Sequence, residues 1–284
     1  MNSKTLNIEN HSRDSANLHY VYPVVSRRAG GVSVGVNLNT NNACNWRCVY
    51  CQVHDLVLGS APPVDMALLE SELRNFLHEL LHGDFMRLRV PESSRRINDI
   101  ALSGNGEPTS AAEFAEVIAL VGRLKHELAL PAEIKLVLIT NGSLLHRETV
   151  QQGIKQMSAL NGEVWFKLDR ANVKGMQLVN NTQISMDNVR KNLATAMALC
   201  PTWLQTCWFA LDGVVPDKLE EEDYLTLLAG LLRDRLPLQG VLLYTLARPS
   251  LQPEAARLEK LSEQQLESFA ERIRALGINV KVAL

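Results

Sequence analysis

The segment that decides the fold follows the first apolar run of the chain and reads NLNTNNACNWRCVYC over residues 37–51. It holds Cys44, Cys48 and Cys51 in the spacing C-x3-C-x2-C. Thiolates so closely spaced are soft ligands that suit zinc or an iron–sulfur cluster. A structural zinc site needs four protein ligands, and His54 could supply one, whereas three cysteines suit a [4Fe–4S] cluster with one iron open to an outside ligand. The spacing favours the cluster and leaves two other interpretations, a structural zinc knuckle and three unrelated thiols.

The composition indicates a soluble protein from a reducing compartment. The chain has 284 residues and is 46% hydrophobic, and its 29 Lys and Arg against 31 Asp and Glu give a formal net charge of −2. That balance argues against tight nonspecific binding of polyanions through the charge of the whole protein. No apolar run reaches the ~18 residues of a membrane span, and the N-terminus lacks the apolar core of a secretory signal. Five cysteines, an odd number, do not form a disulfide framework, so we expect a cytoplasmic protein that binds no membrane.

Apolar runs alternate with segments of helical periodicity from residue 32 onward. The expected strands lie at 32–38, 97–103, 134–140, 163–168, 203–210 and 240–246, with a short last strand at 279–283. The expected helices lie at 66–81, 111–129, 147–160, 186–199, 218–235 and 263–276. Ser110 with Glu113, and Ser262 with Gln265, each fit the capping box that starts a helix.

Six strands that alternate with six helices predict an α/β fold with a mostly parallel sheet and helices outside it. No linker rich in Pro, Gly or Ser divides the chain, so we predict a single domain over 32–284, a (β/α)6 partial, open TIM-like barrel. Residues 1–31 are predicted to be an N-terminal arm or cap. In such folds the chemistry lies at the carboxyl ends of the strands.

A second motif follows the expected strand at 97–103 and reads GNGEPT over Gly104–Thr109. Gly104 and Gly106 let the backbone approach a ligand closely, and Glu107 offers a carboxylate to an ammonium group. Because this loop ends the strand that comes after the cysteine loop, we expect both motifs at the same end of the barrel.

Together the two motifs resemble those of the radical S-adenosylmethionine (radical SAM) superfamily. The three cysteines match its CxxxCxxC motif, with Tyr50 at the aromatic position, and Gly104–Pro108 matches its GGEP motif with Asn105 as one inserted residue. The resemblance implies a [4Fe–4S] cluster on the three thiolates, with SAM bound to the open iron. It also implies reductive cleavage of SAM to a 5′-deoxyadenosyl radical that abstracts hydrogen from a substrate, with electrons from a partner such as flavodoxin or ferredoxin.

The same resemblance, which extends over roughly residues 32–250, implies roles for single residues. Glu107 would hold the methionyl ammonium, backbone near Tyr50 would touch adenine, and Asn141 lies in a segment like one near the SAM ribose in activases. Alternation along the fourth strand puts Lys167 and Asp169 on one face, where they either meet SAM or substrate or form a surface ion pair. The predicted cofactor-binding residues are Tyr50, Gly104, Gly106, Glu107, Asn141, Lys167, Asp169 and Gln205, and the predicted metal ligands are Cys44, Cys48 and Cys51.

Within the superfamily the chain looks closest to the iron–sulfur oxidoreductases that include the tRNA wyosine synthases. The supporting residues are Gly104–Thr109, Lys167–Asp169, Gln205–Thr206, Tyr244–Pro249 and Leu261–Ser262. Those synthases carry an additional cysteine set, and this sequence has none before Cys44, which argues against a tRNA substrate. The basic clusters are Arg27 with Arg28, and Arg87, Arg89, Arg95 and Arg96, and the second cluster precedes a strand and so belongs to the end opposite the site.

Several alternatives stay open at this point. One alternative is a non-catalytic iron–sulfur electron-transfer protein, which would not need the glycine loop at Gly104–Thr109. Another is a zinc-stabilised nucleic-acid-binding module, which 5% aromatic residues and a near-neutral net charge disfavour. Cys200 and Cys207 cannot by themselves ligate a second cluster, so we expect buried structural thiols. Arg248 is either a ligand for an anionic substrate group or a solvent-facing loop residue. The substrate classes in view are a modified nucleotide or tRNA, a peptide or protein, and a small metabolite.

Overall fold

The structure is a computed structural model, and it describes residues 6, 16–26 and 30–284. Within these residues an eight-stranded sheet has the strand order β1-β2-β5-β6-β7-β8-β10-β12. Its strands are β1 (Val21–Ser26), β2 (Gly31–Val36), β5 (Ile97–Leu102), β6 (Lys135–Thr140), β7 (Gly162–Lys167), β8 (Thr202–Cys207), β10 (Leu238–Tyr244) and β12 (Val280–Ala283). The pair β1–β2 is antiparallel and the other neighbours are parallel.

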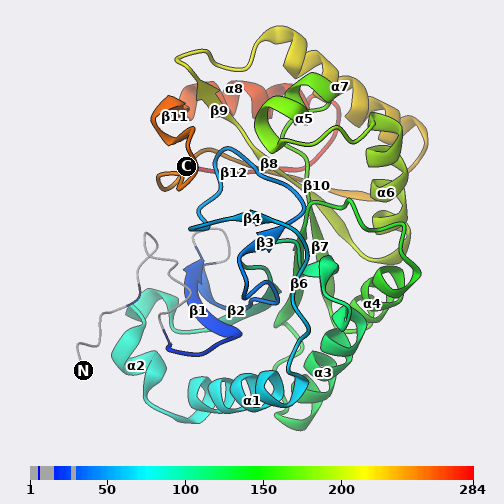
Figure 1. Ribbon diagram of the computed structural model, residues 1–284. Coiled ribbons are helices and arrows are strands. Elements are labelled where there is room, and N and C mark those ends of the chain that lie inside the picture. Colours follow the sequence, from blue (N-terminus) through cyan, green and yellow to red (C-terminus); the bar gives the residue numbers. More distant parts are fainter. Residues whose placement is uncertain (1–5, 7–15, 27–29) are drawn as a thin grey trace.

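Helices form an arc around the outside of the strands (Figure 1). They are α1 (Met66–His82), α2 (Phe85–Arg89), α3 (Phe114–Glu127), α4 (Glu148–Ser158), α5 (Val173–Asn180), α6 (Met186–Leu199), α7 (Lys218–Arg233) and α8 (Glu263–Arg274). Each parallel strand from β2 to β10 is followed by at least one helix, and β1 and β12 form opposite edges of the sheet. The predicted (β/α)6 partial, open barrel is therefore confirmed.

Two small sheets and three short 3-10 turns complete the described elements. Strand β3 (Ala43–Cys44) pairs parallel with β4 (Val57–Leu58), and β9 (Phe209–Leu211) pairs antiparallel with β11 (Leu258–Lys260). The 3-10 turns are η1 (Glu92–Ser94), η2 (Pro108–Ser110) and η3 (Ala255–Arg257). Strand β3 lies in the segment 37–51 that carries the three cysteines, here called the cysteine loop, and β4 follows this loop. The cysteine loop is therefore paired with the chain that follows it.

Strand β7 shows how the sequence sets the two faces of the sheet. Val164 and Phe166 are 0% and 1% exposed and belong to the hydrophobic core. Trp165 and Lys167 are partly exposed and line a cavity inside the barrel. Because successive side chains of a strand point to opposite faces, the alternation predicted for this strand separates core from cavity.

Several segments differ from the prediction. Val21–Ser26, predicted as part of an arm, instead forms β1 and pairs with β2 from Val21↔Val36 to Ser26↔Gly31. Pro23 is tolerated there because an edge strand leaves one row of backbone donors unpaired. Helices α2 and α5 were not predicted. Residues 1–5, 7–15 and 27–29, with Arg27 and Arg28 among them, lie outside the described residues, and the domain boundary after residue 31 stays a prediction.

The two predicted capping boxes have different outcomes. Ser262 and Gln265 form the box at the start of α8. The box of Ser110 with Glu113 is wrong, because α3 begins after Glu113 without a side-chain cap. The Ser110 hydroxyl instead donates to the carbonyl oxygen of Glu107 and accepts the N–H of Ala61. Ser110 thus stabilises the turn after the second motif.

In the part of the chain that the structure describes, no helix combines the length and apolar character needed to cross a membrane.

Candidate functional site

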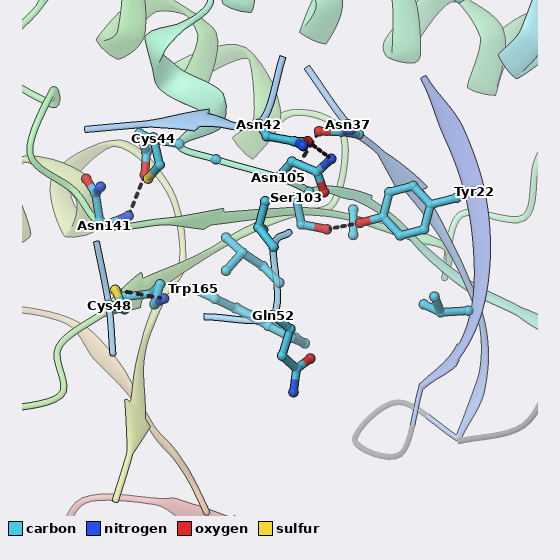
Figure 2. A pocket seen from close by; sticks show the side chains of 18 of the residues that line it. Tyr22, Asn37, Asn42, Cys44, Cys48, Gln52, Ser103, Asn105, Asn141 and Trp165 are labelled. Carbon is cyan, nitrogen blue, oxygen red and sulfur yellow. Dashed lines mark hydrogen bonds between the residues drawn. The ribbon is translucent and has the colours of Figure 1, made fainter. Parts of the chain in front are cut away.

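A cavity of about 910 Å³ opens inside the barrel. Its wall is built from the cysteine loop, the glycine loop after β5, and residues of β1, β2, β6, β7, β8 and β10 (Figure 2). Of the predicted site residues, its wall includes Cys44, Cys48, Gly104, Gly106, Glu107, Asn141, Lys167 and Gln205. Arg248, considered as an anion ligand, also lines it. The structure therefore brings the second motif, two of the three motif cysteines and residues of four later segments to one cavity, whose wall does not include Cys51.

The cysteine loop is held by the carboxyl end of α5. The N–H groups of Arg47 and Val49 donate to the carbonyl oxygens of Asn180 and Val179, at 3.3 and 2.8 Å. The side-chain amide of Asn181 donates back to the carbonyl oxygen of Arg47 at 2.7 Å. Because the last carbonyls of a helix have no partner within the helix, the loop satisfies two acceptors that α5 leaves open. The position of the cysteines is thus fixed by a helix on another part of the barrel.

Cys48 is the most enclosed of the three cysteines in the motif. Its side chain is buried, and its Sγ lies 3.2 Å from Nδ2 of Asn180 and 3.9 Å from Nζ of Lys167. Nδ2 of Asn180 also donates to Oδ2 of Asp169 at 2.7 Å. Two N–H donors from different elements therefore converge on this sulfur, while Cys44 and Cys51 are partly exposed.

Metal binding by these thiols requires them to ionise. Burial raises the pKa of Cys44 to about 12 and also raises the pKa of Cys48, so both thiols must give up a proton when they bind metal. Nitrogen donors aimed at sulfur are the groups that stabilise cluster thiolates. Within residues 6, 16–26 and 30–284, no three His, Cys, Asp or Glu side chains are gathered closely enough to hold a single metal ion.

Asn105 joins the glycine loop to the cysteine loop. Its Nδ2 donates to Oδ1 of Asn42 at 2.6 Å, and its backbone N–H donates to Oδ1 of Asn37 at 3.0 Å (Figure 2). Oδ1 of Asn37 also accepts the N–H of Asn39 at 3.1 Å. The inserted residue of the GGEP-like motif is therefore the one that makes these contacts.

Gly104 and Gly106 lie where the glycine loop comes so close to the cysteine loop that no side chain fits. A Cβ at Gly104, whose φ is +156°, would lie 2.3 Å from Oδ1 of Asn37. A Cβ at Gly106 would lie 2.0 Å from the carbonyl oxygen of Ala43, the residue before the first cysteine. Both distances are far below van der Waals contact, so the two loops pack together only because these positions lack a side chain.

Glu107 is a buried carboxylate held by hydrogen bonds. It is 2% exposed, and its Oε1 accepts from the hydroxyls of Thr109 and Thr140, both at 2.6 Å. Its Oε2 accepts the N–H of Asn141 at 2.7 Å. Burial raises the pKa of Glu107, while the hydrogen bonds from Thr109, Thr140 and Asn141 lower it. Since a carboxylate oxygen has two acceptor positions, Oε2 keeps capacity for a donor in the cavity.

Asn141 is fixed by an amide network that reaches the cysteine loop. Its Nδ2 donates to Oδ1 of Asn45 at 2.8 Å, and Nδ2 of Asn45 donates to the hydroxyl of Ser143 at 2.8 Å. Oδ1 of Asn141 in turn accepts the N–H of Ser143 at 3.0 Å. The carboxyl end of β6 is thus tied to the residue that follows the first cysteine.

Tyr50 and Asp169 were predicted to bind a cofactor, but neither lines the described cavity. The hydroxyl of Tyr50 donates to Oδ2 of Asp169 at 2.6 Å, and Oδ1 of Asp169 accepts the N–H of Cys207 at 2.8 Å. Asp169 is 1% exposed, so its carboxylate is enclosed by donors and does not reach the cavity. The surface ion pair of Lys167 with Asp169, considered as an alternative, is also not what the structure shows. Asp169 thus links Tyr50 of the cysteine loop to the backbone of Cys207.

Sequence reasoning missed Asn180, Asn45 and the pair of Tyr22 with Ser103. Asn180 lies on α5, a helix that was not predicted, and Asn45 carried no signal beyond its place between two cysteines. The Tyr22 hydroxyl lies 2.9 Å from that of Ser103 inside the cavity (Figure 2). This pair was missed because Tyr22 was assigned to the arm. Cys200 and Cys207 are buried, as expected.

The second basic cluster lies at the amino-terminal side of β5, as its place in the sequence predicted. Arg87 and Arg89 belong to α2, which precedes β5. Arg87 pairs with Asp84, and the guanidinium of Arg95 donates to the carbonyl oxygen of Val90. These residues are absent from the cavity wall.

No family model matches the chain. The chain is 29% identical over 167 residues to a UPF0026 protein of Helicobacter pylori strain J99, which covers 58% of this chain and 47% of that protein. It is 25% identical over 161 residues to a UPF0026 protein of Synechocystis, covering 56% and 52%. The chain therefore spans about half the length of these curated relatives.

A third curated protein matches most of this chain. It is the GTPase Obg of Brachyspira hyodysenteriae, 24% identical over 265 residues, which are 91% of this chain and 34% of that protein. The sequence of this chain contains no G-x-x-x-x-G-K-[ST] motif of the kind that cradles nucleotide phosphates in P-loop proteins. The match thus does not extend to a P-loop.

Solved structures share the fold at low sequence identity. SuiB of Streptococcus suis bound to its precursor peptide SuiA superposes with a TM-score of 0.58 at 11% identity, covering 90% of this chain and 49% of that one. A radical SAM methyltransferase from Sphaerobacter thermophilus superposes with a TM-score of 0.58 at 17% identity, covering 89% and 66%.

Fold and site thus define an α/β partial barrel with a polar cavity that receives both predicted motifs. SuiB and the radical SAM methyltransferase share this fold, so the comparisons show the expected fold of the chain.

Proposed function

We propose that this protein is a radical SAM enzyme that binds a [4Fe–4S] cluster on Cys44, Cys48 and Cys51. The observation that carries the proposal is the junction of the cysteine loop and the glycine loop at one cavity. Asn105 and Gly106 contact the cysteine loop directly, and Glu107 lies in the cavity wall beside them. A structural zinc knuckle does not require a buried carboxylate such as that of Glu107, which hydrogen bonds hold in the cavity wall.

Cys44, Cys48 and Cys51 would hold the cluster, which would supply the one electron for reductive cleavage of SAM to methionine and a hydrogen-abstracting 5′-deoxyadenosyl radical. The residues of this chain bind and orient the reactants. Oε2 of Glu107 accepts the methionyl ammonium, because its other oxygen is occupied by two threonine hydroxyls. Gly104 and Gly106 allow the loop that carries Glu107 to pack against the cysteine loop.

The substrate occupies the part of the cavity formed by β1, β5 and the middle strands. Tyr22 and Ser103 offer hydroxyls there, and Trp165 and Gln205 face the same space. A volume of about 910 Å³ is at the upper end of the range for small-molecule sites, so it suits SAM together with a small molecule or one inserted residue or nucleoside. The electron comes from a low-potential one-electron donor of the flavodoxin or ferredoxin class.

The test is anaerobic reconstitution of the protein with iron and sulfide, followed by dithionite and SAM, with 5′-deoxyadenosine measured by mass spectrometry. We expect 5′-deoxyadenosine from the wild-type protein and none from Cys48→Ala prepared in parallel. A cluster that forms but neither binds SAM nor yields 5′-deoxyadenosine would contradict the enzyme and favour an electron carrier. Stoichiometric zinc without visible absorbance would favour a zinc-stabilised module.

A further inference from the structure

Cys48 differs from the other cysteines of its motif in what surrounds the sulfur. Cys44 accepts the N–H of Trp46 at 3.5 Å, a contact within its own loop. The sulfur of Cys48 instead faces side-chain donors from β7 and α5, Lys167 and Asn180. These two donors reach the loop from the barrel, so the barrel contributes directly to the environment of one thiolate.

The side-chain amide of Asn180 donates to two acceptors, a sulfur and a carboxylate oxygen. Its Nδ2 contacts both Sγ of Cys48 and Oδ2 of Asp169, and the residue is 0% exposed. Its Oδ1 has no hydrogen-bond partner among the residues that the structure describes. If the Asn180 amide were flipped, its oxygen would face the sulfur of Cys48 and the carboxylate of Asp169, and the carboxylate would repel it. A buried amide that leaves its own oxygen unsatisfied in order to donate to both groups is positioned for a thiolate, not a thiol.

Lys167 supplies the positive charge near the same sulfur. Its Nζ lies 3.9 Å from Sγ of Cys48 and 5.0 Å from the centre of the Tyr50 ring. Nδ2 of Asn180 contacts both this sulfur and Oδ2 of Asp169, so the amide links the two groups. The arrangement places a cation and an N–H donor against Cys48.

We propose that Lys167 and Asn180 are positioning residues that raise the reduction potential of the cluster through Cys48. Reduction adds one electron and no proton, so the reduced cluster carries one more negative charge. A cation and an N–H donor at a ligating thiolate stabilise that charge, and hydrogen bonds to sulfur are a recognised means by which proteins set cluster potentials. The inference rests on the proposed function, because it requires a cluster on the three cysteines.

The experiment compares Lys167→Met and Asn180→Leu with the wild-type protein and with Lys174→Met. Lys174 is an exposed residue of α5, so the control removes one positive charge without touching Cys48. Each protein is reconstituted anaerobically, assayed for iron and sulfide, and titrated with reductant while the reduced cluster is followed by electron paramagnetic resonance. Both test variants are expected to assemble the cluster and to show a more negative midpoint potential, whereas the control matches wild type.

Lys167→Gln separates charge from hydrogen bonding, because it keeps an N–H donor and loses the cation. A potential between those of wild type and Lys167→Met is expected. Unchanged potentials in Lys167→Met and Asn180→Leu with full iron content would overturn the proposal, and so would loss of the cluster in both, which would assign them a purely structural role. Failure of the proposed function is distinguishable, since the wild-type protein itself would then assemble no cluster or would leave SAM uncleaved.

Discussion

Nδ2 of Asn105 lies 2.6 Å from Oδ1 of Asn42, and this hydrogen bond connects the two motifs of the candidate site. Asn105 is the residue that interrupts the GGEP-like sequence, yet it makes the contact that a strict Gly-Gly pair has no side chain to make. The loop with an extra residue is thereby anchored to the segment that carries the cysteines. Asn42, one residue before β3, has a positive φ of 57°, a conformation that asparagine tolerates better than most residues.

We predict that Asn105→Ala assembles the cluster but binds SAM less tightly, because the glycine loop loses its anchor. A hydrogen bond of this kind is worth about 0.5–1.5 kcal/mol, which corresponds to a roughly 2- to 13-fold higher Kd. The measurement is SAM binding by isothermal titration to the anaerobically reconstituted protein. Asn75→Ala, on the exposed face of α1, is the matched control and is expected to bind like wild type. Equal affinity of Asn105→Ala and wild type would show that this anchor is not used.

Glu107→Gln is predicted to retain the cluster and to lose SAM affinity by about tenfold or more, since hydrogen bonds to charged groups are worth about 1.5–3 kcal/mol. The carboxamide keeps the shape of the side chain but removes the negative charge that would attract the methionyl ammonium. SAM affinity is compared with that of Glu116→Gln, an exposed position on α3. If both variants bind SAM equally well, the ammonium is held by another group.

The parts of the fold that the sequence predicted are those with strong local signals. Each of the six main parallel strands was an apolar run, and each long helix had clear periodicity. Helix α5 has only eight residues, Val173–Asn180, and the interval between the fourth and fifth strands already held the longer α6. Strand β1 contains Pro23 within a short run, and the pairing that stabilises it comes from β2. Short elements whose stability depends on pairing or packing with other elements give little local signal.

In the candidate site, too, local motifs predicted some residues, whereas contacts between distant segments could not be predicted. Glu107 and the cysteines were predicted as site residues because loop motifs at strand ends carry chemistry in parallel α/β folds. For Asp169, strand alternation predicted the face on which the side chain lies but not its neighbours. Its enclosure by Tyr50, Asn180 and the N–H of Cys207 depends on three segments that meet only in the folded chain.

Gly106→Ala is predicted to disturb the cysteine loop, because its Cβ would lie 2.0 Å from the carbonyl oxygen of Ala43. Forcing an atom into a packed site costs about 1–3 kcal/mol, so the melting temperature should fall by roughly 2–12 °C. Gly59→Ala is the matched control, since its Cβ would meet the same residue, at an ordinary 3.4 Å from the Cβ of Ala43. Thermal unfolding and iron content are measured for both proteins. A Gly106→Ala protein as stable as Gly59→Ala, with full iron, would contradict close packing of the two loops.

Iron binding should distinguish the three cysteines of the motif from Cys200 and Cys207. Alanine at position 44, 48 or 51 removes a predicted ligand, so we expect iron to fall from about four atoms per chain towards zero, together with visible absorbance. Cys200→Ala and Cys207→Ala remove buried thiols that lie outside the motif, so each should lose some stability from the cavity it leaves but keep the iron of wild type. Iron, sulfide and zinc are measured in every reconstituted variant, with unfolding curves to confirm that each protein is folded. Full iron in any variant of the first group, or its loss in a folded variant of the second, would mean that the ligand set is not Cys44, Cys48 and Cys51.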